Sequence, residues 1–258
     1  MTLDDISVTR CLFHPRRDDP GYCPQGIATQ TQCDGAVVGG YLHDHVSSDT
    51  LLMFFHGNGE TAADYDGLAS LYMACGVSFW VVDYRGYGQS SGEPSYTSML
   101  RDAEMLLADL PRIAGGTGRR FRRVVVMGRS LGSASAIHLA AECPDDLDAL
   151  ILDSPFADGL ALIQRLGDPA IRRSDVPGFG DNIDRIRGCG LPTLILHGTD
   201  DRIIPVHEAE SLYEAGAGRQ KELVKIEGAG HNDLMMVGRS MYFGKIRDWV
   251  DSRADCGD

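Results

Sequence analysis

The sequence lacks the features that mark membrane-spanning and secreted proteins. No apolar run approaches the roughly 18–20 residues that a membrane-spanning helix requires. The opening stretch MTLDDISVTR holds neither a basic nor an apolar segment, so we expect no secretory signal. The seven cysteines are scattered without a C-x-x-C pair, which favours reduced thiols, with a local disulfide among Cys11, Cys23 and Cys33 left open. These absences predict a cytoplasmic protein without a membrane span.

Positive charge is also scarce. Lysine and arginine number 24 against 37 aspartates and glutamates, so the formal net charge is −13. Such an acidic chain is unsuited to nucleic acid or to anionic membrane surfaces. We therefore expect no nucleic-acid partner, while the composition leaves the oligomeric state undefined.

Short apolar runs alternate along the chain with helical patterns. Runs that are too short for a helix and rich in β-branched residues suit buried strands. Strands followed by helices imply a mostly parallel sheet covered on both faces, which is an α/β fold. The predicted strands are 50–55, 77–82, 122–127, 147–152, 191–196 and 221–226. The predicted helices are 61–75, 99–110, 131–142, 206–215 and a last helix ending near residue 254.

Two segments depart from this alternation. The first 45 residues hold shorter candidate strands at 10–15 and 34–43, which we expect to form an antiparallel edge of the same sheet. Residues 154–190 form a short cap-like excursion with one helical pattern, ADGLALIQRLG. So small an excursion predicts an open, shallow site. No repeat or linker divides the chain, so we expect a single domain over residues 1–258.

A serine stands between two glycines at a predicted strand-to-helix corner. Gly128-Arg129-Ser130-Leu131-Gly132 follows the apolar run VVVM and precedes a helical pattern. The two glycines remove side chains that would collide at a sharp corner. The alternative is a structural role, in which Ser130 is only a helix N-cap between turn glycines.

A histidine and several acids follow later strands. The carboxyl ends of parallel strands share one edge of a sheet, so residues that follow different strands converge there. A serine hydroxyl needs a base to become a nucleophile, and His231 in GAGHND follows the strand predicted at 221–226. The acid that orients it is left open by the residues alone, with candidates Asp200, Asp201, Asp153 and Asp233. For His56 and His197, each followed by glycine at a strand end, we expect hydrogen bonds to neighbouring loops.

These motifs resemble the α/β-hydrolase family over essentially the whole chain. GRSLGS matches the family's nucleophile elbow, G-x-S-x-G, and HGTDDRIIP matches its acid loop with Asp201 as the acid. The segment HGNGE after residues 50–55 implies that the backbone amide of Asn58 joins that of Leu131 in an oxyanion hole. DYRGYGQSSG resembles a structural loop of the family. Together with DSPFAD and GAGHNDL, the motifs are similar to the Bem46-like branch.

The resemblance implies a serine hydrolase that needs no cofactor and no metal. Ser130, His231 and Asp201 would cleave a small-molecule carboxylic ester or thioester through an acyl-enzyme intermediate. An aspartate or thiol nucleophile is excluded by the serine. Protein depalmitoylation is not expected, because the early cysteines form no lipidated cluster. The alternatives are an acyltransferase with the same triad, or a hydrolase-fold binding protein without activity.

Overall fold

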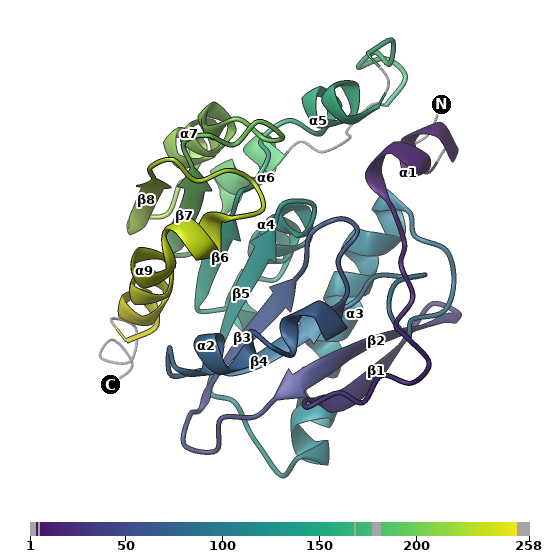
Figure 1. Ribbon diagram of the computed structural model, residues 1–258, viewed down its shortest axis with the longest axis vertical. Coiled ribbons are helices and arrows are strands. Elements are labelled where there is room, and N and C mark those ends of the chain that lie inside the picture. Colours follow the sequence, from purple (N-terminus) through teal and green to yellow (C-terminus); the bar gives the residue numbers. More distant parts are fainter. Residues whose placement is uncertain (1–3, 5, 168, 177–181, 252–258) are drawn as a thin grey trace.

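The computed structural model describes residues 4, 6–167, 169–176 and 182–251. Its centre is an eight-stranded sheet in the order β1-β2-β4-β3-β5-β6-β7-β8 (Figure 1). From β4 through β3 to β8 neighbouring strands are parallel, whereas β1 and β2 are antiparallel additions beside β4. The strands are β1 (Ile27–Cys33), β2 (Ala36–His43), β3 (Thr50–Phe55), β4 (Ser78–Val82), β5 (Arg123–Arg129), β6 (Ala149–Asp153), β7 (Thr193–Gly198) and β8 (Lys221–Ile226). The predicted α/β fold with an antiparallel edge is confirmed.

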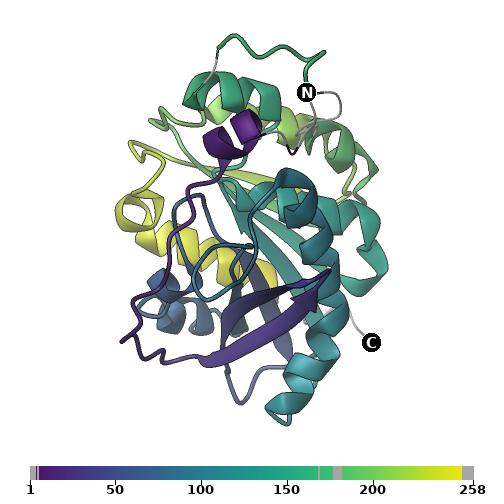
Figure 2. The same cartoon turned by 90° about the vertical axis from the view of Figure 1, so that its right-hand side faces the viewer.

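Helices cover both faces of the sheet (Figure 2). The larger core lies under α3, α4, α6 and α7, and the second lies under η1, α2, α8 and α9. The helices are α1 (Ile6–Leu12), η1 (Ala62–Tyr65), α2 (Ala69–Met73), α3 (Tyr96–Gly116), α4 (Gly132–Glu142), η2 (Pro144–Asp146), α5 (Gly159–Leu166), α6 (Asn182–Gly188), α7 (Val206–Ala215), α8 (Leu234–Val237) and α9 (Arg239–Asp251). Because both faces are covered, every residue of β3, β4, β6 and β7 is buried, which explains their continuous apolar runs.

Two predicted elements are wrong, and β1 and α6 are among the elements that were not predicted. Residues 10–15 are no strand: α1 ends at Leu12, whose side chain is buried in the larger core. The helix predicted over 61–75 is divided into η1 and α2, and between them the Asp66 carboxylate turns inward and accepts the amide of Gln25 at 2.7 Å. β1 has an alternating edge pattern with polar Thr and Gln residues, and α6 is short and charged, so neither has a strong apolar signal.

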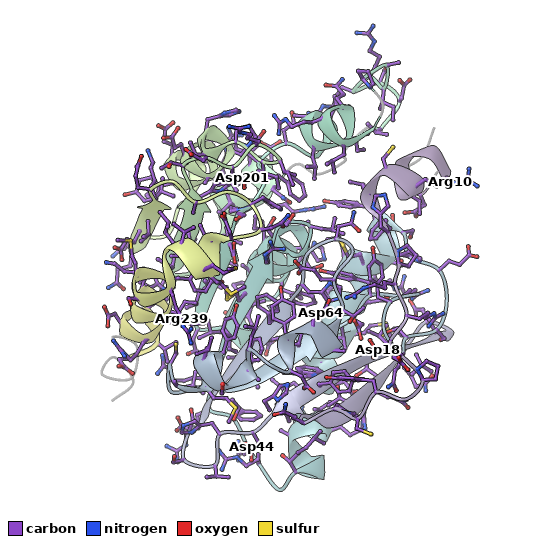
Figure 3. The ribbon with its side chains drawn as sticks, viewed as in Figure 1. Arg10, Asp18, Asp44, Asp64, Asp201 and Arg239 are labelled. Carbon is purple, nitrogen blue, oxygen red and sulfur yellow. The ribbon has the colours of Figure 1, made fainter. Side chains whose placement is uncertain are left out.

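The parallel strands place their carboxyl ends at one edge of the sheet. Asp201, which follows β7, lies at that edge, whereas Asp44, which follows the antiparallel β2, lies at the opposite end (Figure 3). The 154–190 excursion contributes α5, which matches the helical pattern at 157–167 and packs beside α1 at the carboxyl edge. In the part of the chain that the structure describes, no helix has the length and apolar character to cross a membrane.

The cysteines that the structure describes are all free. Cys11, Cys23 and Cys33 form no disulfide with one another. Cys256 lies outside the described residues.

Candidate active site

Ser130 occupies a strained corner between β5 and α4. Its φ is +51°, a left-handed conformation that costs a non-glycine residue about 1–2 kcal/mol. The corner is held by the Ser130 amide, which donates to the Asp153 carbonyl at 2.8 Å, and by the Ser133 hydroxyl, which donates to the Ser130 carbonyl at 2.6 Å. A Cβ on Gly128 would lie 2.3 Å from the Gly132 carbonyl oxygen, and one on Gly132 would lie 2.2 Å from that of Phe55. The glycines therefore allow the tight packing that projects the serine outward.

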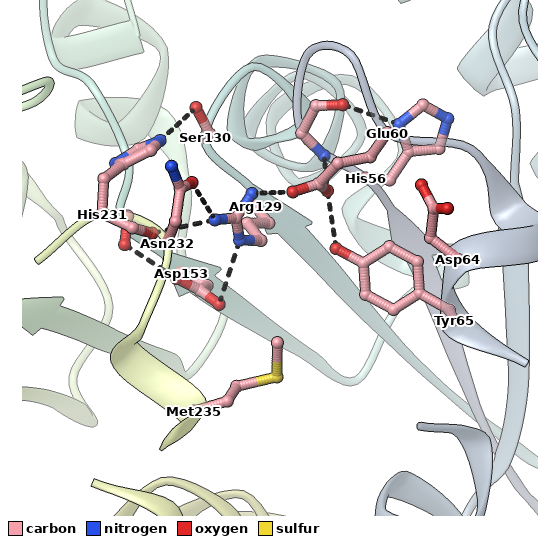
Figure 4. A network of polar contacts seen from close by, with 12 residues as sticks. His56, Glu60, Asp64, Tyr65, Arg129, Ser130, Asp153, His231, Asn232 and Met235 are labelled. Atoms are coloured by element: carbon pink, nitrogen blue, oxygen red, sulfur yellow. Dashed lines mark hydrogen bonds and ion pairs between the residues drawn. The ribbon is translucent and has the colours of Figure 1, made fainter. Parts of the chain in front are cut away.

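His231 lies between the serine and an acid. Its Nε2 is 3.0 Å from Ser130 Oγ, and its Nδ1 is 2.7 Å from Asp201 Oδ2 (Figure 4 shows His231 and Ser130). The three side chains come from loops after β5, β7 and β8, and all three are buried. This geometry allows the imidazole to take a proton from the hydroxyl while the carboxylate holds the ring tautomer.

Asp201 is held as a carboxylate. Its Oδ1 accepts the amides of Ile203 at 2.9 Å and Ile204 at 2.8 Å, while Oδ2 faces both His231 and His197. Burial opposes ionisation, but the hydrogen bonds from the two histidines and from the Ile204 amide outweigh it, so the pKa of Asp201 lies well below its usual range. A carboxylate that stays ionised can stabilise an adjacent imidazolium.

The other candidate acids point elsewhere. Asp200 is exposed, and its nearest side-chain partner is the Thr199 hydroxyl at 3.5 Å. Asp153 accepts the Tyr242 hydroxyl at 2.8 Å. Asp233 accepts the amide of Gly230 at 2.6 Å and so braces the histidine loop. Among the candidates, the structure brings Asp201 alone to the His231 ring.

The loop after β3 is fixed from several sides. The buried His56 ring faces acceptors at both nitrogens, the Gly57 carbonyl at 2.8 Å and Asp83 Oδ1 at 3.2 Å. Burial opposes protonation of this ring, but the hydrogen bond and charge of Asp83 raise its pKa. The Asn58 side chain accepts the Tyr87 hydroxyl at 2.8 Å. These contacts hold the loop of Asn58 beside the corner of Ser130.

A cavity of about 180 Å³ opens beside the serine. Ser130, Leu131, Asn58 and His231 line it together. Within the described residues, the amides of Asn58 and Leu131 donate to no protein acceptor, so both are free to donate to a bound group. Leu131 is also the N-cap of α4, at the positive end of the helix dipole.

The apolar part of the cavity lining was not identified from the sequence. It is formed by Leu12 of α1, Leu162 and Leu166 of α5, and Ile203. The helical pattern at 157–167 was the only sequence signal for these apolar residues, because residues 10–15, which include Leu12, were expected to be a strand. Arg129 also lines the cavity and was not singled out. In the part of the chain that is described, no group of His, Cys, Asp or Glu side chains is arranged to hold a metal ion.

Comparison with known proteins identifies the family. Residues 47–172 match the family described as serine aminopeptidase, S33. The chain is 33% identical over 210 residues to alpha/beta hydrolase domain-containing protein 17B of Xenopus laevis, covering 79% of this chain and 67% of that one. The human protein of the same name is 32% identical over 203 residues, covering 77% and 65% of the two chains. The chain therefore spans about two thirds of the length of these relatives.

Solved structures show the same fold. An esterase of Pyrococcus furiosus superposes with a TM-score of 0.76 at 18% identity, covering 92% of this chain and 98% of the esterase. A soluble variant of monoglyceride lipase from Saccharomyces cerevisiae superposes with a TM-score of 0.70 at 17% identity, covering 90% and 97%. From the sequence relatives, the family model and the shared fold, we conclude that the chain belongs to the α/β-hydrolase superfamily.

Proposed function

We propose that this protein is a serine hydrolase that cleaves carboxylic esters or thioesters of short apolar acyl groups. The observation that supports it best is the continuous contact from Ser130 Oγ through His231 to Asp201, at 3.0 and 2.7 Å, beside a cavity with an apolar wall. The family of the chain makes a hydrolase the expected class of activity.

The proposed reaction proceeds in two halves. Ser130 Oγ attacks the acyl carbon as its proton passes to His231 Nε2, and Asp201 stabilises the imidazolium. The amides of Asn58 and Leu131 donate to the oxyanion of the tetrahedral intermediate. His231 then protonates the departing alcohol or thiol, leaving an acyl ester on Ser130. Water attacks that ester by the same proton transfers, which releases the carboxylic acid and restores the serine.

The size of the cavity favours a short acyl chain. An apolar protein cavity of about 150 Å³ holds one benzene ring, so the 180 Å³ here suits an acyl group of about six carbons. Burying each additional methylene contributes about 0.8 kcal/mol, or roughly fourfold in kcat/KM. We expect this gain to stop when the cavity is filled.

Turnover of p-nitrophenyl esters graded from acetate to decanoate tests the proposal. We expect kcat/KM to rise with chain length and to level off near hexanoate. Ser130→Ala should lower kcat by at least about 10⁴-fold while the far-UV circular dichroism and the Tm stay close to those of the wild type. Turnover that survives this substitution would refute the role of Ser130.

The same assay separates the alternatives. An alcohol acceptor added to the reaction would yield an acylated alcohol if the protein is an acyltransferase. An aminoacyl p-nitroanilide tests for peptide-bond cleavage, the activity named in the matching family. A fluorophosphonate probe that leaves Ser130 unlabelled in folded protein would indicate a binding protein without activity.

A further inference from the structure

Arg129, the residue before the serine, places a buried guanidinium among the loops of the candidate site. It is 6% exposed and lies at the end of β5. Its Nη1 forms an ion pair with Glu60, and its Nη2 donates to the His231 carbonyl at 2.8 Å and to Asn232 Oδ1 at 3.0 Å (Figure 4). Asp153 Oδ2 lies 4.0 Å from its Nε. A buried charge is tolerated when it is paired and hydrogen-bonded in this way.

Glu60 links the Arg129 guanidinium to the loop of Asn58. Its Oε2 accepts the amide of Gly57 at 2.7 Å and the Tyr65 hydroxyl at 2.7 Å. A Cβ on Gly57 would lie 2.6 Å from Arg129 Nη1 and 3.0 Å from Glu60 Oε2, so the loop backbone packs directly against the ion pair. The pair therefore joins the residue before Asn58 to the residue before Ser130.

The Arg129 guanidinium thus links the three segments whose relative positions the proposed reaction depends on. It belongs to the corner of Ser130, it reaches the loop of Asn58 through Glu60, and it binds the main chain of His231 itself. Arginine suits this place because its planar fork directs several donors at fixed angles, whereas a lysine ammonium is a compact point charge on a flexible stem.

We propose that Arg129 and Glu60 are positioning residues that keep the Asn58 amide and the His231 ring at reactive distance from Ser130. The inference rests on the hydrolase function proposed above. A displacement of about 1 Å in a reacting group can cost about 10²-fold in rate, so small movements of these loops should be visible in kcat. Arg129 also lines the cavity, but the apolar side chains expected to bind the acyl group, Leu12, Leu162 and Leu166, are left in place, so KM should change little.

A double-mutant cycle tests the proposal against a purely structural role. Arg129→Met and Glu60→Gln, made singly, each leave a buried polar or charged group with fewer partners and should lower the Tm. In Arg129→Met/Glu60→Gln neither charge remains, so the Tm should recover in part. We expect kcat to stay reduced by about 10–100-fold in the double variant, with KM within about threefold of wild type. Wild-type kcat in a double variant with a recovered Tm would overturn the proposal.

The Arg85–Asp102 ion pair provides a matched control. It is likewise a largely buried ion pair, here bidentate, but it links the loop after β4 to α3 and contacts the Cys33 carbonyl. Arg85→Met/Asp102→Asn should affect the Tm without changing the kcat of the folded protein. Equal kcat losses in the two double variants would show that a general loosening of the fold explains the effect.

A second measurement is independent of turnover. We expect hydrogen exchange of residues 57–60 and 228–232 to accelerate in Arg129→Met/Glu60→Gln and to stay unchanged in the Arg85/Asp102 control. If the wild type neither hydrolyses the esters nor reacts with the fluorophosphonate, the proposed function fails, and exchange alone decides whether the pair holds the loops. Unchanged exchange in both segments would refute the positioning role itself.

Discussion

His197 Nε2 lies 3.4 Å from Asp201 Oδ2, the same carboxylate oxygen that faces His231. The His197 ring also donates to the Ile204 carbonyl at 2.7 Å, and the ring is fully buried. His197, the first residue of HGTDDRIIP, therefore ties the start of this loop to Asp201 within it. Together with the amides of Ile203 and Ile204, this contact holds Asp201 turned inward.

The two adjacent aspartates should differ sharply in their effect on activity. We expect Asp201→Asn to lower kcat by about 10⁴-fold, because an amide cannot stabilise the His231 imidazolium and favours the wrong tautomer. Asp200→Asn is the matched control and should stay within a few-fold of wild type, since its side chain is exposed. Steady-state ester hydrolysis measures both, and a similar loss in the two variants would contradict the assignment.

The lowered pKa of Asp201 predicts an acid-dependent contribution to stability. A carboxyl whose folded-state pKa lies below its unfolded value of about 3.8 contributes stability above that pH, and the contribution is lost as the pH falls through the folded pKa. The difference in free energy of unfolding between wild type and Asp201→Asn should therefore shrink from pH 5 to pH 3. Urea titrations at each pH measure it. A constant difference would mean that the carboxyl titrates alike in both states.

The glycine after the serine corner should tolerate no side chain. Gly132→Ala places a Cβ 2.2 Å from a backbone oxygen of Phe55, and backbone has little freedom to move there. We expect a loss of more than about 3 kcal/mol in the free energy of unfolding. Gly115→Ala in α3 is the control, because its Cβ would meet nothing within 4 Å. That variant should gain about 0.5–1 kcal/mol from helix propensity, and equal effects by chemical denaturation would refute the packing argument.

Leu166 should set the longest acyl group that is accepted. It lines the cavity and is 44% exposed, so it stands at the rim. Leu166→Trp should move the optimum of the ester series to shorter chains, and Leu166→Ala should move it to longer ones. Met236→Trp, at an exposed residue outside the cavity lining, should leave the series unchanged. If neither substitution of Leu166 moves the chain-length optimum, the acyl group binds elsewhere.

Much of the architecture was readable from local patterns. The run of β3 and the helix over 206–215 match the predicted bounds, because a strand buried on both faces leaves a continuous apolar run and an amphipathic helix leaves a periodic pattern. The elements that were missed lack that signal. β1 alternates at an exposed edge, and the break in the helix predicted over 61–75 falls beside Asp66, whose carboxylate accepts amides from a segment some forty residues earlier.

The sequence by itself determined the α/β fold, the glycine-flanked corner of Ser130, and the loops after β7 and β8 that carry an acid and a histidine. Those features depend on periodicity, backbone conformation and the direction of parallel strands, which are local or topological properties. Only the tertiary structure decided that Asp201 reaches His231, that Arg129 pairs with Glu60, and that α1 and α5 wall the cavity. Such contacts join residues far apart in the chain, and they depend on how side chains pack in three dimensions.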